Sequence, residues 1–589
     1  MKSAVNFVNF FREPLEMKET MMSFRFSRKI GKKMTDGFRI HKSVCLFSTI
    51  VAAVSIMALG AGCSDTDSTP PRSDSIPVFT LDENSSGCLE KLDNLLNLSV
   101  VSNDDNTLKA EYKAGFIYGH LLKQQIISAR DNTWDSAYIT DPSHSFPKQI
   151  PPSTDELDET QAVMLENYAY SIDYARNLSD PTIQNYMKRL IFRMLGVYHG
   201  VVLKQPEALD FSGEWLPTLD YFSDSELQCN YETETLSFMD LYLINAQMDL
   251  FGYLLPPENQ YHYSRCTAFA KKTEDDIFMA HNSWSSFLDQ SMAGSFYVNG
   301  SFCALNMAAP GLIRSGQDFG YNGKGIMFFE TTIDNTLNQP KVNALWEVWR
   351  SAMAEIFSGS MDEFYSLITL ETSGTYMNSY VIADTITREI GLIEMSWDTT
   401  VYFKPDPEAE GGYQVITTPE EGVSKEYDTL MLQPDYILGF NDAVSLAIRE
   451  QLASINNRPA RQWQLLAQIY DVTDIEISKD LITFTDPYNP LSIYGRWDLG
   501  YGWTTTPQTV PDGSLDAKAA SASMLANISD LKGVLNVNSS NRAFWMKFGT
   551  PVVDGKPFIW SESQWSEQKL RDVPDEVDGN YHYFKTHIE

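Results

Sequence analysis

Apolar positions recur at helical spacing through much of the first half of the chain. A capping-box pattern from Ser153 to Glu156 predicts a helix that runs toward residue 175. Asp180 and Pro181 supply an N-cap and a first-turn proline for a second helix, whose apolar residues continue at helical spacing. The apolar run over 237–254 is typical of a third helix. The chain before Cys266 is therefore predicted to be rich in helices.

From residue 266 onward, the pattern changes to the alternation that is typical of strands. In 266–270, apolar and polar or bulky side chains alternate with a period of two. A charged turn over 271–276 separates this run from a second apolar run, 277–280, which leads into His281. The two runs predict a hairpin with Cys266 at its open end. A thiol and an imidazole can therefore meet there.

The rest of the pattern groups strands together, with helices between the groups. Strands are predicted at 295–298, 302–307, 325–333, 380–384 and 390–396, and helices at 343–357, 360–370 and 441–455. From about residue 474 the pattern weakens. Strands and helices segregated in this way predict an α+β fold with two packed sheets covered by helices.

Composition places the chain among large globular proteins and argues against some classes of binding partner. The 589 residues include 45 Lys and Arg against 78 Asp and Glu, which gives a net charge of −33. Such a charge argues against nucleic acid or an anionic membrane surface as a partner recognised through charge. At 43% hydrophobic residues, the chain can bury a large core.

The N-terminus has the pattern of an export signal. A basic segment precedes an uncharged stretch over 43–62, and the motif LGAGC ends at Cys63. This predicts a signal segment at 1–62 and a bacterial lipoprotein acylated on Cys63, with 63–76 as a flexible tether. The leucine lies four residues before the cysteine instead of three. A plain signal peptide, with a secreted product, and an uncleaved anchor stay open as alternatives to a lipoprotein of the periplasm or outer membrane.

The remaining cysteines and the histidines offer few known site patterns. An exported protein can form disulfides, and Cys88 with Cys229 is one candidate pair that sequence does not decide. The eight histidines have no compact metal-ligand spacing, and no GxSxG, Walker or GxGxxG motif is present. We therefore expect no metal and no cofactor.

Several motifs occur in the order found in a known family. They are Cys266-Thr267-Ala268, Ala280-His281-Asn282-Ser283-Trp284, Phe329-Glu330-Thr331-Thr332-Ile333, Ser373-Gly374-Thr375-Tyr376-Met377-Asn378, Phe440-Asn441, Arg461 and Arg496-Trp497-Asp498-Leu499. In these, the chain resembles the phospholipase B-like proteins, which are N-terminal-nucleophile (Ntn) hydrolases. The resemblance implies a four-layer αββα sandwich. It also implies a precursor part at 77–265 and a core chain at 266–589.

The resemblance implies that Cys266 is the nucleophile and becomes a chain terminus. Its sulfur would attack the carbonyl of Arg265, and hydrolysis of the thioester would leave Cys266 with a free α-amine. Such an amine has an ordinary pKa of about 7.7 to 8, which suits a general base. The alternative interpretation of Cys266 is a small buried side chain in a strand.

Other site residues are implied by the same resemblance, each with a structural alternative. His281 would orient or tune the nucleophile, Trp284 would line the substrate pocket, and Thr332, or Thr331 one residue away, would belong to the site. All three are equally explained as core or strand residues. Asn378 and Arg496 belong to motifs without an assigned chemical step.

Two further residues complete the implied site. Asn441 would donate a hydrogen bond to the oxyanion, or it would act as the N-cap of a helix that follows it. Arg461 matches the site arginine, although a one-residue gap keeps Arg458 as an alternative.

The implied reaction is hydrolysis of acyl ester or amide bonds, with lipids as the substrate class. The alternatives are a peptide or peptidoglycan amidase on the same fold and a non-catalytic surface binding lipoprotein. The expected partners are a small-molecule or lipid acyl substrate, the membrane through the N-terminal lipid anchor, and the protein's own cleaved N-terminal chain.

Overall fold

The structure is a computed structural model, and its described part forms one compact unit that begins at Ile76. It describes residues 76–92, 95–138, 151–254, 266–285, 291–299, 301–316, 318–333, 340–451, 458–485, 492–494, 514–525, 542–548, 558–562, 566, 571–572, 575–577 and 579–586. The predicted signal segment, Cys63, Arg265 and Arg496 lie outside these residues. Within them, no helix combines the length and the apolar character that a membrane span requires.

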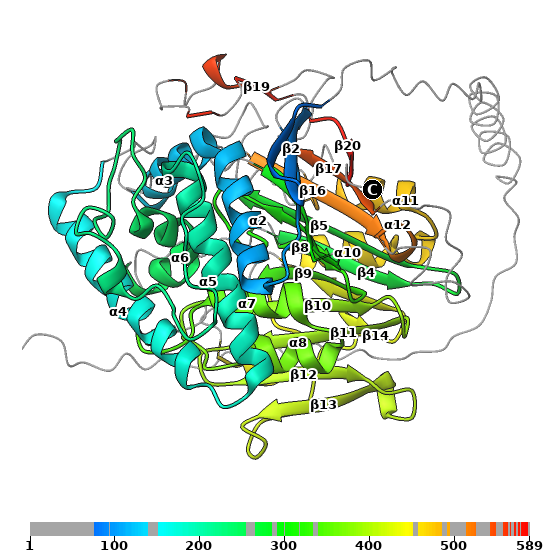
Figure 1. Ribbon diagram of the computed structural model, residues 1–589. Helices are drawn as coiled ribbons and strands as arrows, with labels where there is room; N and C mark the ends of the chain where they lie inside the picture. Colours follow the sequence, from blue (N-terminus) through cyan, green and yellow to red (C-terminus); the bar gives the residue numbers. More distant parts are fainter. Residues whose placement is uncertain are drawn as a thin grey trace, which may run out of the picture. The chain divides into compact units, whose positions relative to one another are not determined.

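The larger sheet has eleven strands in the described part of the chain, and its strands come from both sides of Cys266 (Figure 1). Adjacent strands are antiparallel, except that β3 and β6 pair in parallel. Their order is β1 (Val78–Asp82), β2 (Ser85–Leu92), β3 (Leu95–Ser102), β6 (Ser291–Val298), β7 (Ser301–Ala308), β8 (Phe319–Asn322), β9 (Ile326–Thr332), β10 (Asn378–Asp384), β11 (Glu389–Met395), β12 (Thr400–Pro405) and β13 (Tyr413–Thr418).

The smaller sheet contains the predicted hairpin at its centre. Its described strands, all antiparallel to their neighbours, follow the order β14 (Leu432–Gln433), β15 (Tyr436–Gly439), β4 (Cys266–Lys272), β5 (Ile277–Ser285), β16 (Ser514–Ser521), β17 (Ala543–Phe548) and β20 (His582–Lys585). A separate short pair joins β18 (Phe558–Ile559) and β19 (Glu576–Val577). The hairpin is thus braced by strands that lie far away in the sequence.

The helices fall into an early group and a late group. The early helices are α2 (Thr107–Leu121), α3 (Lys123–Tyr138), α4 (Thr154–Asn177), α5 (Pro181–Val202), α6 (Phe238–Leu254), α7 (Glu347–Phe357) and α8 (Met361–Ile368). The late helices are α9 (Leu446–Arg449), α10 (Arg458–Leu466), α11 (Ile475–Ile482) and α12 (Ala522–Leu525). Helices α11 and α12 pack against β16 of the smaller sheet.

Strand alternation in the larger sheet separates two apolar clusters. In β9, Ile326 and Phe328 join a cluster with the early helices, whereas Met327 and Phe329 join a second cluster with residues of the smaller sheet. This is the period-two pattern of a strand that is buried on both faces. The two sheets therefore pack face to face, and the early helices cover the other face of the larger one.

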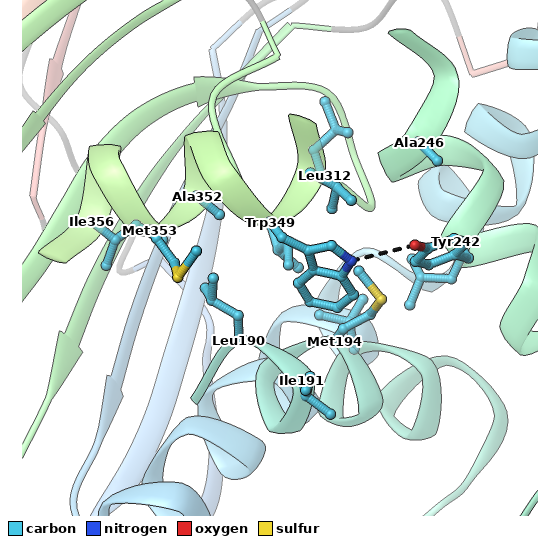
Figure 2. Close-up of a cluster of buried hydrophobic side chains, with 14 of the residues drawn as sticks. Leu190, Ile191, Met194, Tyr242, Ala246, Leu312, Trp349, Ala352, Met353 and Ile356 are labelled. Atoms are coloured by element: carbon cyan, nitrogen blue, oxygen red, sulfur yellow. Dashed lines mark hydrogen bonds between the residues drawn. The ribbon is translucent and has the colours of Figure 1, made fainter. Parts of the chain in front are cut away.

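Trp349 lies at the centre of the helical cluster (Figure 2). Its indole, on α7, is buried among Leu190 and Met194 of α5 and lies beside Tyr242 of α6. The indole N–H donates a hydrogen bond to the Tyr242 hydroxyl at 3.3 Å. Aromatic side chains bury a large apolar area while keeping one polar contact. Trp349 therefore joins three helices over one face of the larger sheet.

Helices α2 and α5 cross at backbone contact. A Cβ added to Gly115 would lie 2.1 Å from the carbonyl oxygen of Arg193, and one added to Gly196 would lie 2.2 Å from that of Tyr112. Gly119 and Gly200 are equally close to the opposite backbone. Two glycines spaced by four on each helix let the backbones approach in this way.

Much of the predicted secondary structure is confirmed. The capping box at Ser153 and the N-cap at Asp180 both form. The hairpin, the helix over 237–254 and the two strands near 380 and 390 are present. The α+β class is therefore correct.

Three expectations differ from the structure. The helix predicted over 441–455 is wrong, because Asn441 has a φ of 62° and helix α9 covers four residues. Strands β1, β2 and β3 were not predicted, although they belong to the segment expected to be rich in helices. Cys88 and Cys229 are both buried free thiols, so the candidate disulfide does not form.

Candidate active site

Cys266 is the first residue of β4, at the open end of the hairpin. In the β4–β5 register, Cys266 pairs with Ser283, and Ala268 pairs with His281. On its other side, β5 places His281 opposite Lys518 of β16. Cys266 is 4% exposed. Strands β4 and β5 therefore hold Cys266 and His281 close together, as predicted.

Asn441 binds the backbone of Cys266. Its Oδ1 accepts a hydrogen bond from the backbone N–H of Cys266 at 2.5 Å, and its Nδ2 donates one to the carbonyl oxygen of Thr332 at 2.9 Å. The side chain is buried. Asn441 follows Phe440 just after β15 and has a φ of 62°. The N-cap alternative is wrong, because Ser445 precedes helix α9. Asn441 thus joins β4 to the end of β9.

Arg461 of α10 binds the carbonyl side of the same residue. Its Nη1 donates to the carbonyl oxygen of Cys266 and, at 2.8 Å, to the hydroxyl of Thr267. Its Nη2 donates to the carbonyl oxygen of Phe440 at 2.9 Å. The guanidinium is fully buried. Both backbone polar groups of Cys266 are therefore fixed by side chains, while the side chain of Arg458 is not described.

His281 is fully buried beside the thiol. Cys266 Sγ, a ring nitrogen of His281 and a carboxylate oxygen of Asp318 all lie within 4.8 Å of one another. Neither ring nitrogen has a hydrogen-bond partner among the described residues. Burial and the charge of Lys518 hold the pKa of His281 well below its ordinary value, although the backbone of Glu330 acts in the opposite direction. The imidazole is therefore neutral near pH 7.

Two carboxyl groups act on the thiol, and neither was among the predicted site residues. Burial raises the pKa of Asp318 to about 6 even though Lys518 and Arg314 lower it. Burial and the neighbouring charge of Asp318 raise the pKa of Glu330 well above its ordinary value. Each of the two carboxyl groups acts on the pKa of the other. A carboxyl pair of this kind shares a proton, because two adjacent buried charges repel.

The carboxyl pair continues into a hydroxyl chain. The Tyr376 hydroxyl donates to Glu330 Oε2 at 3.0 Å and lies 2.6 Å from Thr332 Oγ1. Thr332 is therefore in the polar network, as its motif suggested, whereas the Thr331 side chain contacts Gly439. Asn378 donates to Glu347 instead. The backbone of Trp284 lies in β5, but its side chain is not described.

The thiol itself is held in its protonated form by these surroundings. Burial raises the pKa of Cys266, and the charges of Asp318 and Glu330 raise it further. The Asn441 amide and Lys518 act in the opposite direction. Lys518 is in turn paired with Asp516, whose Oδ1 lies 2.5 Å from Nζ. A base close to Sγ is therefore needed before the sulfur can act as a nucleophile.

Some of the missed residues had a signal in the sequence. Glu330 is a carboxylate within an apolar strand, and Tyr376 lies in a motif that was noted without a chemical role. A buried charge in an apolar run is a functional signal in its own right. Asp318 and Lys518 offered none, because each depends on strand pairing far along the chain.

Known proteins share this part of the chain. The family described as Phospholipase B matches residues 94–391, which include Cys266, His281, Asp318 and Thr332. Phospholipase-B 81 from Drysdalia coronoides is 26% identical over 357 residues, which cover 52% of this chain and 61% of that protein. The chain thus spans less than two thirds of that relative's length. On the family match, which takes in half of its residues, the chain belongs to the phospholipase B family.

Proposed function

We propose that this protein is an Ntn hydrolase that cleaves acyl ester bonds of lipids with Cys266 as its nucleophile. The observation that carries the proposal is the hydrogen bond from the Cys266 backbone nitrogen to Asn441 Oδ1. Once the preceding peptide bond is cut, that nitrogen is an α-amine next to Sγ and already oriented. The family and the relative named Phospholipase-B 81 support lipid as the substrate class.

Maturation would use the same thiol. Cys266 Sγ attacks the carbonyl carbon of Arg265, the carbon–nitrogen bond breaks, and the thiol proton ends on the Cys266 nitrogen. Water then hydrolyses the thioester and releases a carboxylate at Arg265 and a free thiol. Arg461 supports both steps, because its hydrogen bond to the Cys266 carbonyl keeps the residue from rotating.

Turnover would repeat this chemistry on a lipid. The α-amine takes the thiol proton, Sγ attacks the acyl carbonyl, and the alcohol leaves with that proton. Water cleaves the acyl thioester and regenerates the thiol. The neutral imidazole of His281, with a ring nitrogen within 4.8 Å of the sulfur, would not compete for its proton. Asn441 acts in this scheme as a positioning residue for the amine.

The same chemistry extends to amide substrates. Thioester formation proceeds from an N-acyl group as it does from an ester. The proposal also includes export of the protein to the cell envelope. The segment before residue 76 supports export with acylation at Cys63, which would bring the enzyme to a membrane surface.

The test is intact mass and N-terminal sequencing of the wild-type protein beside Cys266→Ala. The expected wild-type product has one chain that ends at Arg265 and one that begins at Cys266, while Cys266→Ala stays whole. Cys229→Ala is the matched control, because it removes another buried thiol and should be cut normally.

Substrate class is then measured by fatty-acid release from a diacyl phospholipid and from an N-acyl amine. Release from the phospholipid that requires Cys266 supports the esterase. A folded wild-type chain that stays whole and releases nothing refutes the catalytic proposal and favours a binding lipoprotein.

A further inference from the structure

Three potential metal ligands converge on the nucleophile from three separate elements. They are Cys266 Sγ of β4, a ring nitrogen of His281 of β5, and a carboxylate oxygen of Asp318 in the turn before β8, all within 4.8 Å of one another. We propose that these side chains form a binding site for a borderline divalent transition metal of the Zn²⁺ class, which blocks the thiol when it is bound.

The spacing suits such an ion after small side-chain rotations. Zn²⁺ binds sulfur at about 2.3 Å and nitrogen or oxygen at about 2.0–2.2 Å, so its tetrahedral ligand atoms stand roughly 3.3–3.6 Å apart. In the proposed site, rotation of the side chains about their Cα–Cβ bonds would bring the ligand atoms, which lie within 4.8 Å of one another, into that range.

His281 supplies an independent reason to place a ligand here. The ring is 0% exposed, and neither nitrogen makes a hydrogen bond of good geometry with the described residues, although the Glu330 backbone acts on the ring. Buried polar atoms without partners are uncommon and call for an unseen group. A metal ion would bind one of these nitrogens directly.

The surrounding charges favour a cation. Glu330 interacts with Asp318, and an outer carboxylate of this kind supports a metal ligand. Lys518 and Arg314 are the opposing cations that act on Asp318. Asp516 lies 2.5 Å from the Lys518 ammonium group and offsets its charge, and Glu347 and Glu355 act in the same way on Arg314. Together with the thiolate, the carboxylates therefore leave the site with an excess of negative charge.

The ligand set also selects the kind of metal. Ca²⁺ and Mg²⁺ take oxygen ligands, whereas a thiolate with an imidazole suits Zn²⁺, Co²⁺ and related ions. Sequence spacing could not reveal this site, since its three ligands lie at residues 266, 281 and 318 and are brought together by strand pairing. The expectation of no metal came from the lack of a compact motif.

Metal binding would act as a reversible inhibitor. The sulfur forms a bond to the metal, and its proton leaves to solvent. The bound thiolate then no longer attacks a carbonyl, so both maturation and lipid hydrolysis stop until a chelator removes the ion. The inhibition rests on the proposed function, but metal binding itself does not.

Cobalt binding to the full chain tests the site without an activity assay. We expect one Co²⁺ per chain, with a thiolate-to-cobalt charge-transfer band that disappears in Cys266→Ser. Asp318→Asn should lower the Zn²⁺ affinity at least 10-fold in calorimetry, in line with the loss of a ligand or its support. Cys88→Ser is the control that should bind as wild type does, because Cys88 is a buried thiol outside the trio.

A second measurement needs no variant. Zn²⁺ should slow alkylation of Cys266 in the wild-type chain at least 10-fold and leave alkylation of Cys88 unchanged, as read by peptide mass mapping. An unchanged band in Cys266→Ser, or equal alkylation with and without Zn²⁺, overturns the proposal. A chain that is cut and hydrolyses lipid but binds no metal refutes this site alone. A folded chain that binds metal and stays uncut after a chelator has removed the ion refutes the proposed function alone.

Discussion

His199 is a buried histidine that the fold keeps neutral. Its Nδ1 lies 2.8 Å from the Tyr112 hydroxyl, and the side chain is 3% exposed. Burial lowers its pKa to about 4, although Glu207 and Glu226 act in the opposite direction. Between pH 6.5 and 4, the unfolded chain therefore binds a proton that the folded chain does not.

The consequence is acid sensitivity of the fold. The contribution of His199 is complete above pH 6.5 and is lost as the pH falls toward 4, by about 3 kcal/mol in total. We expect the stability difference between wild type and His199→Gln to shrink by about that amount from pH 7 to pH 4, as measured by urea unfolding. His120→Gln, on the exposed end of α2, is the control. A difference that stays constant with pH would contradict the expectation.

At the same scale, sequence found the residues that share a local pattern. Cys266 and His281 lie in one hairpin, so strand alternation and a short turn were enough to bring them together. Asp318 and Lys518 reach the thiol through pairing between distant strands, which no local pattern contains. Asn441 was expected as an oxyanion donor or an N-cap, and its hydrogen bond to the Cys266 backbone was not foreseen. Its positive φ ends the strand and turns the side chain back toward Cys266.

At the scale of elements, the crossing of α2 and α5 is the most sensitive contact. Gly196 lies against the Tyr112 carbonyl, and a buried fork joins Glu111 of α2 to Arg189 and Arg193 of α5. An added methyl group at the crossing must separate the helices, and the fork would stretch with them.

Gly196→Ala should therefore destabilise the protein by about 3 kcal/mol, the upper part of the usual range for overpacking. Thermal or urea unfolding measures the change. Gly359→Ala is the matched control, because a methyl group there meets only the flexible ends of the Lys324 and Glu363 side chains and should change stability little. Equal effects of the two substitutions would contradict the close crossing.

Elements with strong end signals were predictable, whereas the strands before α2 were not. Helices α4 and α5 carry side-chain N-caps, which the sequence shows directly. Strand β3 is buried almost throughout and pairs in parallel with β6, so it lacks the alternation that marks a half-exposed strand. Its position in the sheet depends on a partner almost 200 residues away.

At the scale of the whole molecule, the segments before and after Cys266 form one structure. Strands β1 to β3 extend the larger sheet from β6, and α5 and α6 pack with α7 in one apolar cluster. If the proposed cleavage before Cys266 occurs, we expect the two resulting chains to co-elute in size-exclusion chromatography and to separate in denaturant. The uncut Cys266→Ala variant gives the reference elution volume. Separation in native buffer would contradict this expectation.

The pairing of β5 with β16 also determines the earliest time at which the site around Cys266 can assemble. His281 lies opposite Lys518, which follows Cys266 by 252 residues (518 minus 266). At a synthesis rate of roughly 5–20 residues per second, the ribosome needs on the order of 13–50 s to pass from one to the other. During that interval Cys266 has been made, but β16, which completes the surroundings of His281, has not. The proposed self-cleavage by the assembled site would therefore be a late event, which begins only after most of the polypeptide has been made.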